Sequence, residues 1–398
     1  MGDTKCNKDG WVKKKLGEVL QVERGGSPRP ISSFLTDSED GINWIKISDA
    51  VDGNKYISQT KEKIKPEGMK KSRFVHKGDF ILSNSMSFGK PYILQIDGCI
   101  HDGWLVLHDE KNAFDKIWLY YYLGSPFVYR EFQRMAEGGV VNNLNSSLVR
   151  NLKIVIPPLS EQQHIVSELD CLNGIIEKQK EQLKQLDELA QSIFYDMFGD
   201  PVENEMGWEF FKLSNICDKI TDGTHNSPKT YTQGDYLYVT AKNIKPDGFD
   251  FSDISYVSRD VHIPIYARCN PELGDVLYIK DGATTGIAMI NNLTEEFSLL
   301  SSVALLKVKR DQLVNYYLKY LLNNSSKYAE IREMMGGAAI TRLTITKIKD
   351  IKIPVPPLAL QQAFASKIEA IEHQKELIKK SIAETETLFN SRMDYYFG

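Results

Sequence analysis

Polar, glycine-rich loops hold the residues of this chain whose types and spacing could do chemistry. Three such loops occur, and each has a counterpart later in the sequence: residues 24–29 with 222–229, residues 83–90 with 280–286, and residues 138–143 with 336–342. Glycine allows one backbone to approach another closely, while Ser, Thr, His and Asn offer hydrogen bonds and Arg or Lys offers a positive charge. Loops of this kind are suited to the base edges and phosphates of a nucleic acid.

A purely structural role is the simpler interpretation, because a Gly-Ser-Pro segment is usually a turn and duplicated folds share their turns. The contrast between the copies favours binding: the glycine frame is kept while the polar side chains differ, as expected of one scaffold that recognises two sequences. His225 by itself is more typical of a hydrogen-bonding loop residue than of a ligand or base. The side chains that we expect to contact DNA are Arg24, Ser27, Arg29, Asn84, Ser85, Lys90, Asn142, Asn143, Thr224, His225, Asn226, Ser227, Lys229, Lys280, Thr284, Thr285, Thr341 and Arg342.

No motif for catalysis or metal binding accompanies these loops. The chain has neither the Asn/Asp-Pro-Pro-Tyr/Phe loop of a DNA methyltransferase nor a Gly-x-x-x-x-Gly-Lys-Ser/Thr nucleotide loop. The seven histidines have no metal-ligand spacing, and the five cysteines are scattered without a Cys-x-x-Cys pair. We therefore expect a non-catalytic protein without a metal site, with reduced thiols and a cytoplasmic location.

Charge and composition permit a DNA partner without requiring one. The chain of 398 residues has a net charge of −4, but residues 1–157 hold 23 basic and 19 acidic side chains. The lysines at 13–15 and at 61–71 are best explained as solvated faces, although either group could touch phosphates. No run of residues reaches the roughly 18 apolar positions of a membrane span, and the first residues lack the apolar core of a signal peptide.

A long internal repeat organises the whole sequence. The segment 156–163, Ile-Pro-Pro-Leu-Ser-Glu-Gln-Gln, returns at 355–362 as Val-Pro-Pro-Leu-Ala-Leu-Gln-Gln. Gly-Trp at 10–11 returns at 207–208, and Phe-Gly at 198–199 returns as the last two residues. This period is too long for a solenoid, so the chain is expected to contain two tandem units, each a domain followed by an appendage.

The appendages are predicted to be long helices. Apolar residues follow a 4-3-4-3 spacing through residues 160–198, which is the seam of a coiled coil, with Ser160 as the N-cap and Gln163 completing a capping box. The second copy keeps this register but places Lys375, Thr385 and Arg392 on the seam. A narrow apolar stripe needs a partner helix, and pairing between the two copies is expected through Ile165, Leu169, Leu172, Ile176, Leu183, Leu186, Ile193, Phe364, Ile368, Ile371, Ile378, Ile382 and Phe389.

The segments between the helices are predicted to be rich in strands. Short apolar runs rich in β-branched and aromatic residues alternate with Gly and Asp, as at 78–82 and 274–279, with one helix per unit near 118–132 and 314–334. The expected fold class is mixed α/β. Its predicted domains are 1–157 and 200–356, and its predicted helices are 158–199 and 357–398, paired antiparallel with approximate two-fold symmetry.

Duplicated Pro-Pro-Leu-x-x-Gln-Gln helices that follow globular segments resemble the specificity subunits of type I restriction–modification enzymes. The second unit matches that family's pattern most fully, in Thr221–His225, Gly274–Leu277, Asp281–Gly286, Gly336–Ala338 and Val355–Leu358. The first unit departs from it, because Gly-Gly-Ser-Pro replaces Asp-Gly-Thr-His and Ser-Asn-Ser-Met-Ser replaces Lys-Asp-Gly-Ala-Thr. These departures leave the contact residues of the first unit less defined. The resemblance spans essentially the whole chain.

The resemblance implies two target recognition domains, each of which reads one half of a bipartite double-stranded DNA site. It also implies that the paired helices set the length of the unread spacer and dock two methyltransferase (modification) subunits, which restriction subunits join. The chain itself would need no cofactor, because S-adenosylmethionine, ATP and Mg would belong to the partner subunits. The alternative is a coiled-coil scaffold whose two domains bind a ligand or a peptide.

Overall fold

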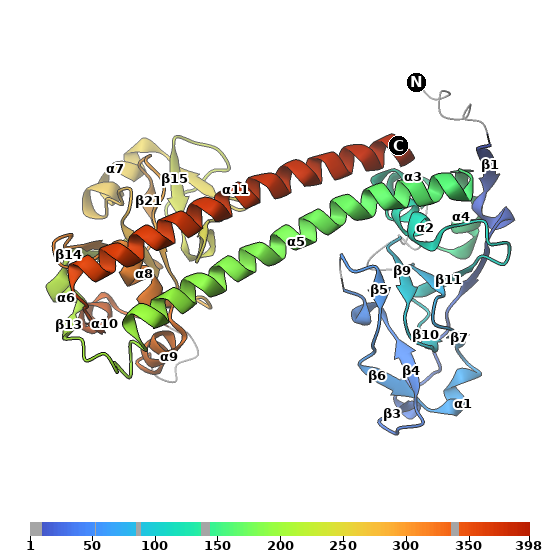
Figure 1. The fold of residues 1–398 in the computed structure, drawn as a ribbon, viewed down its shortest axis with the longest axis horizontal. Coiled ribbons are helices and arrows are strands. Elements are labelled where there is room, and N and C mark those ends of the chain that lie inside the picture. Colours follow the sequence, from blue (N-terminus) through green and yellow to red (C-terminus); the bar gives the residue numbers. More distant parts are fainter. Residues whose placement is uncertain (1–9, 52, 85–88, 137–143, 336–341) are drawn as a thin grey trace. The chain divides into compact units, whose positions relative to one another are not determined.

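Two long helices connect the parts of this chain in the computed structural model, which describes residues 10–51, 53–84, 89–136, 144–335 and 342–398 (Figure 1). Helix α5 spans Leu159–Phe198 and helix α11 spans Leu358–Phe397. The chain divides into two compact units, of which unit 1 is Met1–Gln179 with Ser381–Gly398 and unit 2 is Lys180–Lys380. Each unit therefore holds one globular part and half of each long helix.

Two five-stranded sheets form the globular part of unit 1. Its strands are β1 (Val12–Lys15), β2 (Gln21–Arg24), β3 (Leu35–Thr36), β4 (Ile42–Ile45), β5 (Tyr56–Ile57), β6 (Glu62–Ile64), β7 (Arg73–Val75), β8 (Phe80–Ser83), β9 (Pro91–Leu94), β10 (Gly98–Ile100), β11 (Trp104–His108) and β12 (Lys153–Ile156). The strand orders are β2-β11-β8-β9-β5 and β3-β6-β4-β10-β7, and β1 pairs with β12. Strand β11 is buried on both faces. Leu105 and Leu107 pack into a core with helices, whereas Trp104 and Val106 pack into a core that includes Ile45 of the second sheet.

Unit 2 repeats this plan with fewer strands. They are β13 (Phe210–Lys212), β14 (Cys217–Asp222), β15 (Tyr236–Val239), β16 (Ile244–Lys245), β17 (Gly248–Phe249), β18 (Ser255–Val257), β19 (Val276–Ile279), β20 (Ala288–Ile290), β21 (Ser298–Leu299), β22 (Val303–Val308) and β23 (Lys352–Pro354). The sheets are β14-β22-β19-β20, β18-β15-β21, β13-β23 and β16-β17. Strand β22 alternates as β11 does, with Ala304 and Leu306 in one core and Val303 and Leu305 in the other.

The shorter helices correct one prediction. They are α1 (Pro66–Met69), α2 (Lys116–Leu123), α3 (Pro126–Ala136), α4 (Ser146–Asn151), α6 (Leu213–Ile216), α7 (Arg259–Arg268), α8 (Asn315–Asn323), α9 (Ser325–Glu333) and α10 (Ile345–Asp350). The single helix predicted in each unit is a pair, α2 with α3 and α8 with α9. Ser125 Oγ accepts a hydrogen bond from Val128 N at 3.2 Å, and Asn324 Oδ1 accepts one from Ser326 N at 3.0 Å. These side chains cap a new helix at the point where the predicted helix would have continued.

The start of the first long helix corrects another prediction. Helix α5 begins at Leu159, and Pro158 O accepts hydrogen bonds from the backbone of Glu161 and Gln162. Ser160 therefore lies inside the first turn and is not the N-cap, and Gln163 is exposed. The mixed α/β fold class with two long helices is nevertheless confirmed.

A buried glutamine anchors each long helix to its own globular part. Gln162 Oε1 accepts from Asp115 N at 2.8 Å, while its Nε2 donates to Ala113 O at 3.0 Å and Pro157 O at 2.9 Å. Gln361 repeats the arrangement in unit 2. The carbonyl of its side chain accepts from Val314 N at 2.9 Å, and its Nε2 donates to the carbonyls of Gln312 and Pro356 at 3.1 and 2.8 Å. The first Gln of the repeated Gln-Gln pair is therefore a clamp between the helix and the domain.

The halves of the two long helices pair antiparallel within each unit. In unit 1, Gln179 Nε2 donates to Ser381 Oγ at 2.7 Å, and Arg392 forms an ion pair with Glu168. In unit 2, the buried Lys375 Nζ lies 2.7 Å from Asp187 Oδ1. The pKa of Glu168 lies below its ordinary value, mainly because Arg392 donates hydrogen bonds to it.

Two of the polar seam residues, Lys375 and Arg392, are thus each paired with a carboxylate of the other long helix. Thr385, the third polar seam residue, donates its hydroxyl to Ser381 O within the same helix. Every residue of the predicted apolar seam is buried or half-buried.

Candidate nucleic-acid interface

The first glycine-rich loop of each unit leaves the end of a strand and turns under another backbone segment. In unit 1, β2 ends at Arg24, and a Cβ added at Gly25 would lie 2.2 Å from His101 O. In unit 2, β14 ends at Asp222, and a Cβ added at Gly223 would lie 1.9 Å from Leu299 O. Only glycine fits at these two positions, because the clash would be with backbone atoms that cannot rotate away.

Asp102 organises the interface of unit 1. Ser27 Oγ donates to Asp102 Oδ1 at 2.9 Å, and Arg29 Nη2 lies 3.5 Å from Asp102 Oδ2. Arg24 Nε and Asn84 Nδ2 both donate to the backbone carbonyl of Asp102, at 3.0 and 2.9 Å. Residues from the first and second loops therefore meet at one acidic residue.

The environment of Asp102 keeps its carboxyl ionised. Partial burial acts to raise the pKa of Asp102. The hydrogen bond from Ser27 and the charges of His101, Arg24 and Arg29 together lower that pKa below its ordinary value. His101 Nε2 lies 2.9 Å from Asp102 Oδ1. An ionised carboxylate in this position fixes the direction of the surrounding donors.

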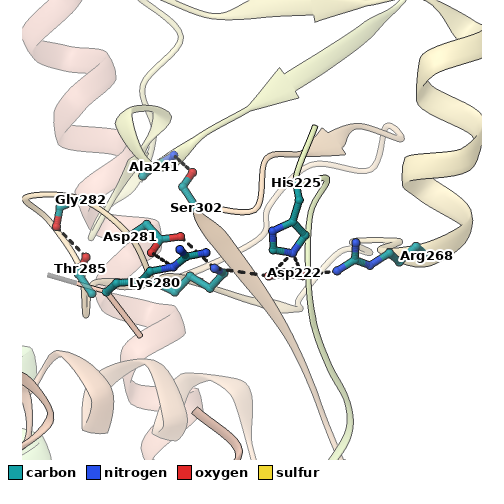
Figure 2. Close-up of polar contacts among 10 residues, drawn as sticks. Asp222, His225, Ala241, Arg268, Lys280, Asp281, Gly282, Thr285 and Ser302 are labelled. Atoms are coloured by element: carbon teal, nitrogen blue, oxygen red, sulfur yellow. Dashed lines mark hydrogen bonds and ion pairs between the residues drawn. The ribbon is translucent and has the colours of Figure 1, made fainter. Parts of the chain in front are cut away.

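Asp222 is the corresponding centre in unit 2, and Figure 2 shows the side chains that converge on it. His225 Nε2 lies 3.1 Å from Asp222 Oδ2, Lys280 Nζ lies 3.4 Å from the same oxygen, and Arg268 of α7 forms an ion pair with Oδ1. Asp222 and Lys280 are buried, with side chains 4% and 2% exposed, whereas His225 and Arg268 are each half exposed. The buried ion pair between Asp222 and Lys280 thus positions two half-exposed side chains, His225 and Arg268.

The second loop is contacted by the last residue of the third loop in unit 2 and by the residue that follows the third loop in unit 1. In unit 2, Arg342 Nε lies 3.0 Å from Asp281 Oδ1, and Leu343 N donates to Lys280 O at 2.8 Å. In unit 1, Leu144 N donates to Asn84 O at 2.9 Å. In unit 2 the described residues of all three loops are therefore neighbours, as expected of a single binding surface, whereas the third loop of unit 1 lies outside the described residues.

The two surfaces share a backbone frame but carry different charges at equivalent positions. Asn84 N donates to Gly103 O and Lys280 N donates to Ser302 O, both at 2.9 Å, so Asn84 and Lys280 are equivalent positions. Arg24 and Asp222 are also equivalent, since each ends a strand before the tightly packed glycine. The cation Arg24 of unit 1 corresponds to the anion Asp222 of unit 2. The neutral amide of Asn84 in unit 1 corresponds to the cation Lys280 in unit 2. Identical frames therefore present different hydrogen-bonding groups.

The predicted contact residues separate into four groups. The first group belongs to the two clusters and consists of Arg24, Ser27, Arg29, Asn84, His225, Lys280 and Arg342. Two of these, Asn84 and Lys280, are buried and position their neighbours. Exposed residues of the same loops are Thr284, Asn226, Ser227 and Lys229, while Thr224 is half-buried and accepts a hydrogen bond from Asn226 N. Predicted contacts that lie outside the described residues are Ser85, Asn142, Asn143 and Thr341.

Two predicted contacts lie elsewhere. Thr285 is fully buried and its hydroxyl donates to Gly282 O at 2.7 Å, so it stabilises its loop instead of facing outwards. Lys90 is exposed beside a cavity of about 320 Å³ that is also lined by Tyr121 and Asn173, away from Asp102. These residues followed from loop position alone, which does not fix the direction of a side chain.

The sequence reasoning missed five cluster residues: Asp102, His101, Asp222, Arg268 and Asp281. Asp281 lies in the motif Asp281–Gly286, but it is acidic and is therefore not among the predicted DNA contacts. Arg268 lies in helix α7, between the loops. Asp102 and His101 precede strand β11 and carry no glycine-rich signal. They also line an open cavity of about 680 Å³ beside the first loop, together with Trp44 and Lys46.

Neither a metal centre nor a membrane span is found in the part of the chain that the structure describes. No cluster of three His, Cys, Asp or Glu side chains there is arranged to hold a metal ion, and none of the described helices is apolar and long enough to cross a bilayer. The described cysteines 99, 171, 217 and 269 are all free, and burial raises the pKa of Cys99 to about 11.

Comparison with known proteins agrees with this geometry. A sequence profile of the family described as the type I restriction modification DNA specificity domain matches residues 8–187 and 205–387. The MjaVIII specificity subunit of a type I restriction enzyme from Methanocaldococcus jannaschii is 20% identical over 94% of this chain and 89% of its own length. The EcoBI specificity subunit from Escherichia coli is 18% identical over 94% of this chain and 82% of its own length.

Solved structures share the fold. A chain from a study of complex assembly in a type I restriction–modification system matches with a TM-score of 0.61 at 20% identity, covering 98% of both chains. The S subunit of such a system from M. genitalium matches with a TM-score of 0.52 at 15% identity, covering 97% of this chain and 96% of that one. The profile match to both halves shows that this chain belongs to the type I restriction–modification DNA specificity family and carries its DNA specificity domain twice.

Proposed function

We propose that this chain is the DNA specificity subunit of a type I restriction–modification enzyme. Segments 1–157 and 200–356 are the target recognition domains, and each reads one half of a bipartite site in double-stranded DNA. The observation that carries this proposal is the pair of loop clusters around Asp102 and Asp222, which have one backbone frame but different polar and charged side chains at equivalent positions. A scaffold that repeats its frame and varies its polar groups can read two sequences.

In this proposal, the long helices 158–199 and 357–398 connect the two target recognition domains. They set the length of the unread spacer and dock two methyltransferase subunits. Restriction subunits then join this complex. Catalysis, S-adenosylmethionine, ATP and Mg belong to those partners, and the complex works in the cytoplasm. The glutamine clamps at the helix starts support this role, because they fix each helix to the domain whose position it would determine.

Changing one tight glycine at a time tests whether the domains read separately. Gly25→Ala is expected to displace the first loop and abolish recognition of one half-site, while Gly223→Ala abolishes recognition of the other. Each substitution forces a Cβ against a backbone carbonyl and is expected to destabilise its unit by about 1–3 kcal/mol. The measurement is genome-wide mapping of DNA methylation by the assembled enzyme that contains each variant.

Gly53→Ala provides a control, since a Cβ at that position would meet no neighbour within 4 Å, although its positive φ gives some strain. The methylated sequence should remain that of the unsubstituted enzyme. Loss of both half-sites from a single glycine change would refute separate reading. Absence of any sequence preference in the unsubstituted enzyme would favour the scaffold alternative.

Lengthening both helices tests the spacer. One heptad inserted after Lys180 and one after Lys380 keeps the seam in register and adds about 10 Å of helix, at ~1.5 Å per residue. The spacer is then expected to grow by about three base pairs, at ~3.4 Å per pair, with both half-sites unchanged. Methylation mapping reads out both quantities. An altered half-site with an unchanged spacer would contradict this role of the helices.

A further inference from the structure

A basic turn lies beside the first loop of unit 1 and takes no part in the cluster around Asp102. We define it as Lys65–Arg73, which includes helix α1 and the first residue of β7. Its cations are Lys65, Lys70, Lys71 and Arg73, and its one acidic residue is Glu67. The three lysines are exposed.

Direct packing joins the basic turn to the first loop. A Cβ added at Gly26 would lie 3.1 Å from Lys71 O, so the two backbones touch. Gly26 N and Ser72 Oγ both donate to the carbonyl of Ile100, at 3.2 and 3.1 Å. Because the turn and the loop share an acceptor and touch at Gly26, the turn is held beside the first loop.

The lysine charges of the basic turn are not neutralised by the protein. Arg73 Nη1 lies 3.1 Å from Glu23 Oε2, whereas Lys65 Nζ donates to the backbone carbonyl of Ser33 at 3.0 Å. Lys71 Nζ lies 4.9 Å from the centre of the Phe34 ring. Among the carboxylates that the structure describes, none forms an ion pair with Lys65, Lys70 or Lys71.

The corresponding segment of unit 2 has a different character. Strand β18 pairs with β15 as β6 pairs with β4, and helix α7 follows β18 as α1 follows β6. Helix α7 carries Arg259 and Arg268 with Asp260, and Arg268 is bonded to Asp222. At this position, therefore, the described residues show an uncompensated group of lysines in unit 1 but not in unit 2.

We infer that the basic turn binds the DNA phosphates that flank the half-site read by unit 1, and so carries sequence-independent affinity. This inference rests on the proposed DNA-reading function and adds a division of labour to it. Lysine ammonium groups next to a reading loop fix the register of a duplex without reading its bases. Neutralising each phosphate releases condensed cations, so each contact steepens the dependence of affinity on salt.

Replacing Lys70 and Lys71 with glutamine tests the inference in the assembled methyltransferase. The probes are a duplex that carries the methylated motif and a duplex of the same composition with both half-sites scrambled. The slope of log affinity against log salt is expected to become shallower by about 1.8, at ~0.9 per phosphate, on both duplexes. Affinity at about 0.15 M salt should fall on the order of 10-fold, and the methylated sequence should stay the same.

Lys13→Gln with Lys14→Gln is the matched control, because these exposed lysines lie on β1 in the same unit and away from the loop (Figure 1). The control should keep the original salt slope, and Lys70→Arg with Lys71→Arg should restore it. A double glutamine variant whose slope equals that of the control overturns the inference even if the motif is still preferred. Equal affinity of the unsubstituted enzyme for both duplexes would instead overturn the proposed function.

Discussion

Replacing Gln162 or Gln361 with alanine is expected to lower the free energy of unfolding of the affected unit by about 3–5 kcal/mol. Each amide makes three hydrogen bonds to backbone groups of the domain and of the segment before its helix. Both side chains are fully buried, so truncation leaves one N–H and two carbonyls without their partner. An unsatisfied buried polar group costs about 1–3 kcal/mol.

Glutamate at either position is expected to be no better than alanine. It keeps the oxygen that accepts from Asp115 N but loses the donor to Ala113 O and Pro157 O. A carboxylate would then face two carbonyl oxygens in a buried site, which is unfavourable at neutral pH. This comparison separates the hydrogen bonds of the clamp from the space that the side chain fills.

The neighbouring glutamines are matched controls within the same motif. Gln163 and Gln362 are exposed, so their alanine variants should change the stability by less than about 0.5 kcal/mol. Urea unfolding measures the difference, and hydrogen exchange at the Asp115 and Val314 amides reports on each clamp separately. Equal stability of Gln162→Ala and Gln163→Ala would contradict the clamp.

Periodicity in the sequence predicts the long helices almost to the residue. The predicted span of 160–198 compares with Leu159–Phe198, because proline and glycine stop a helix by covalent geometry. The capping box was wrong because its residues fit the motif by type, while Pro158 places the first turn one residue earlier. A motif of local sequence cannot show that Gln162 finds its partners 47 and 49 positions away.

The candidate site was predictable only in its loops. Their glycines repeat and therefore stand out, and the structure brings the described parts of these loops together. The acidic centres that hold them do not stand out, since Asp102 reaches Arg24 from 78 positions away and Ser27 from 75. Charge complementarity on the helix seam was hidden in the same way, because Lys375 faces Asp187 from 188 positions away. Long-range pairing of polar groups depends on the fold, so the spacing of one segment does not reveal it.

Asp222→Ala is expected to abolish recognition of the half-site read by unit 2 and to destabilise that unit by about 3 kcal/mol. The substitution removes the counter-charge of Lys280, which is buried, and of Arg268, together with the hydrogen-bonding partner of His225. Lys280 keeps Asp281 at 2.9 Å, which limits the cost of the lost pair. His225 and Arg268 lose the acceptor that fixes them, and their half-exposed side chains become free to rotate.

Two further variants distinguish positioning by Asp222 from simple loss of stability. His225→Ala removes an outward-facing group without opening the buried pair, so it should alter the half-site while changing stability by less than about 0.5 kcal/mol. Asp222→Asn combined with Lys280→Met replaces the buried ion pair with neutral groups, which should recover most of the stability. It should not restore the half-site, because an amide has no charge with which to hold Arg268. Thermal unfolding and methylation mapping measure the two effects independently, and an unchanged second half-site in Asp222→Ala would exclude the positioning role.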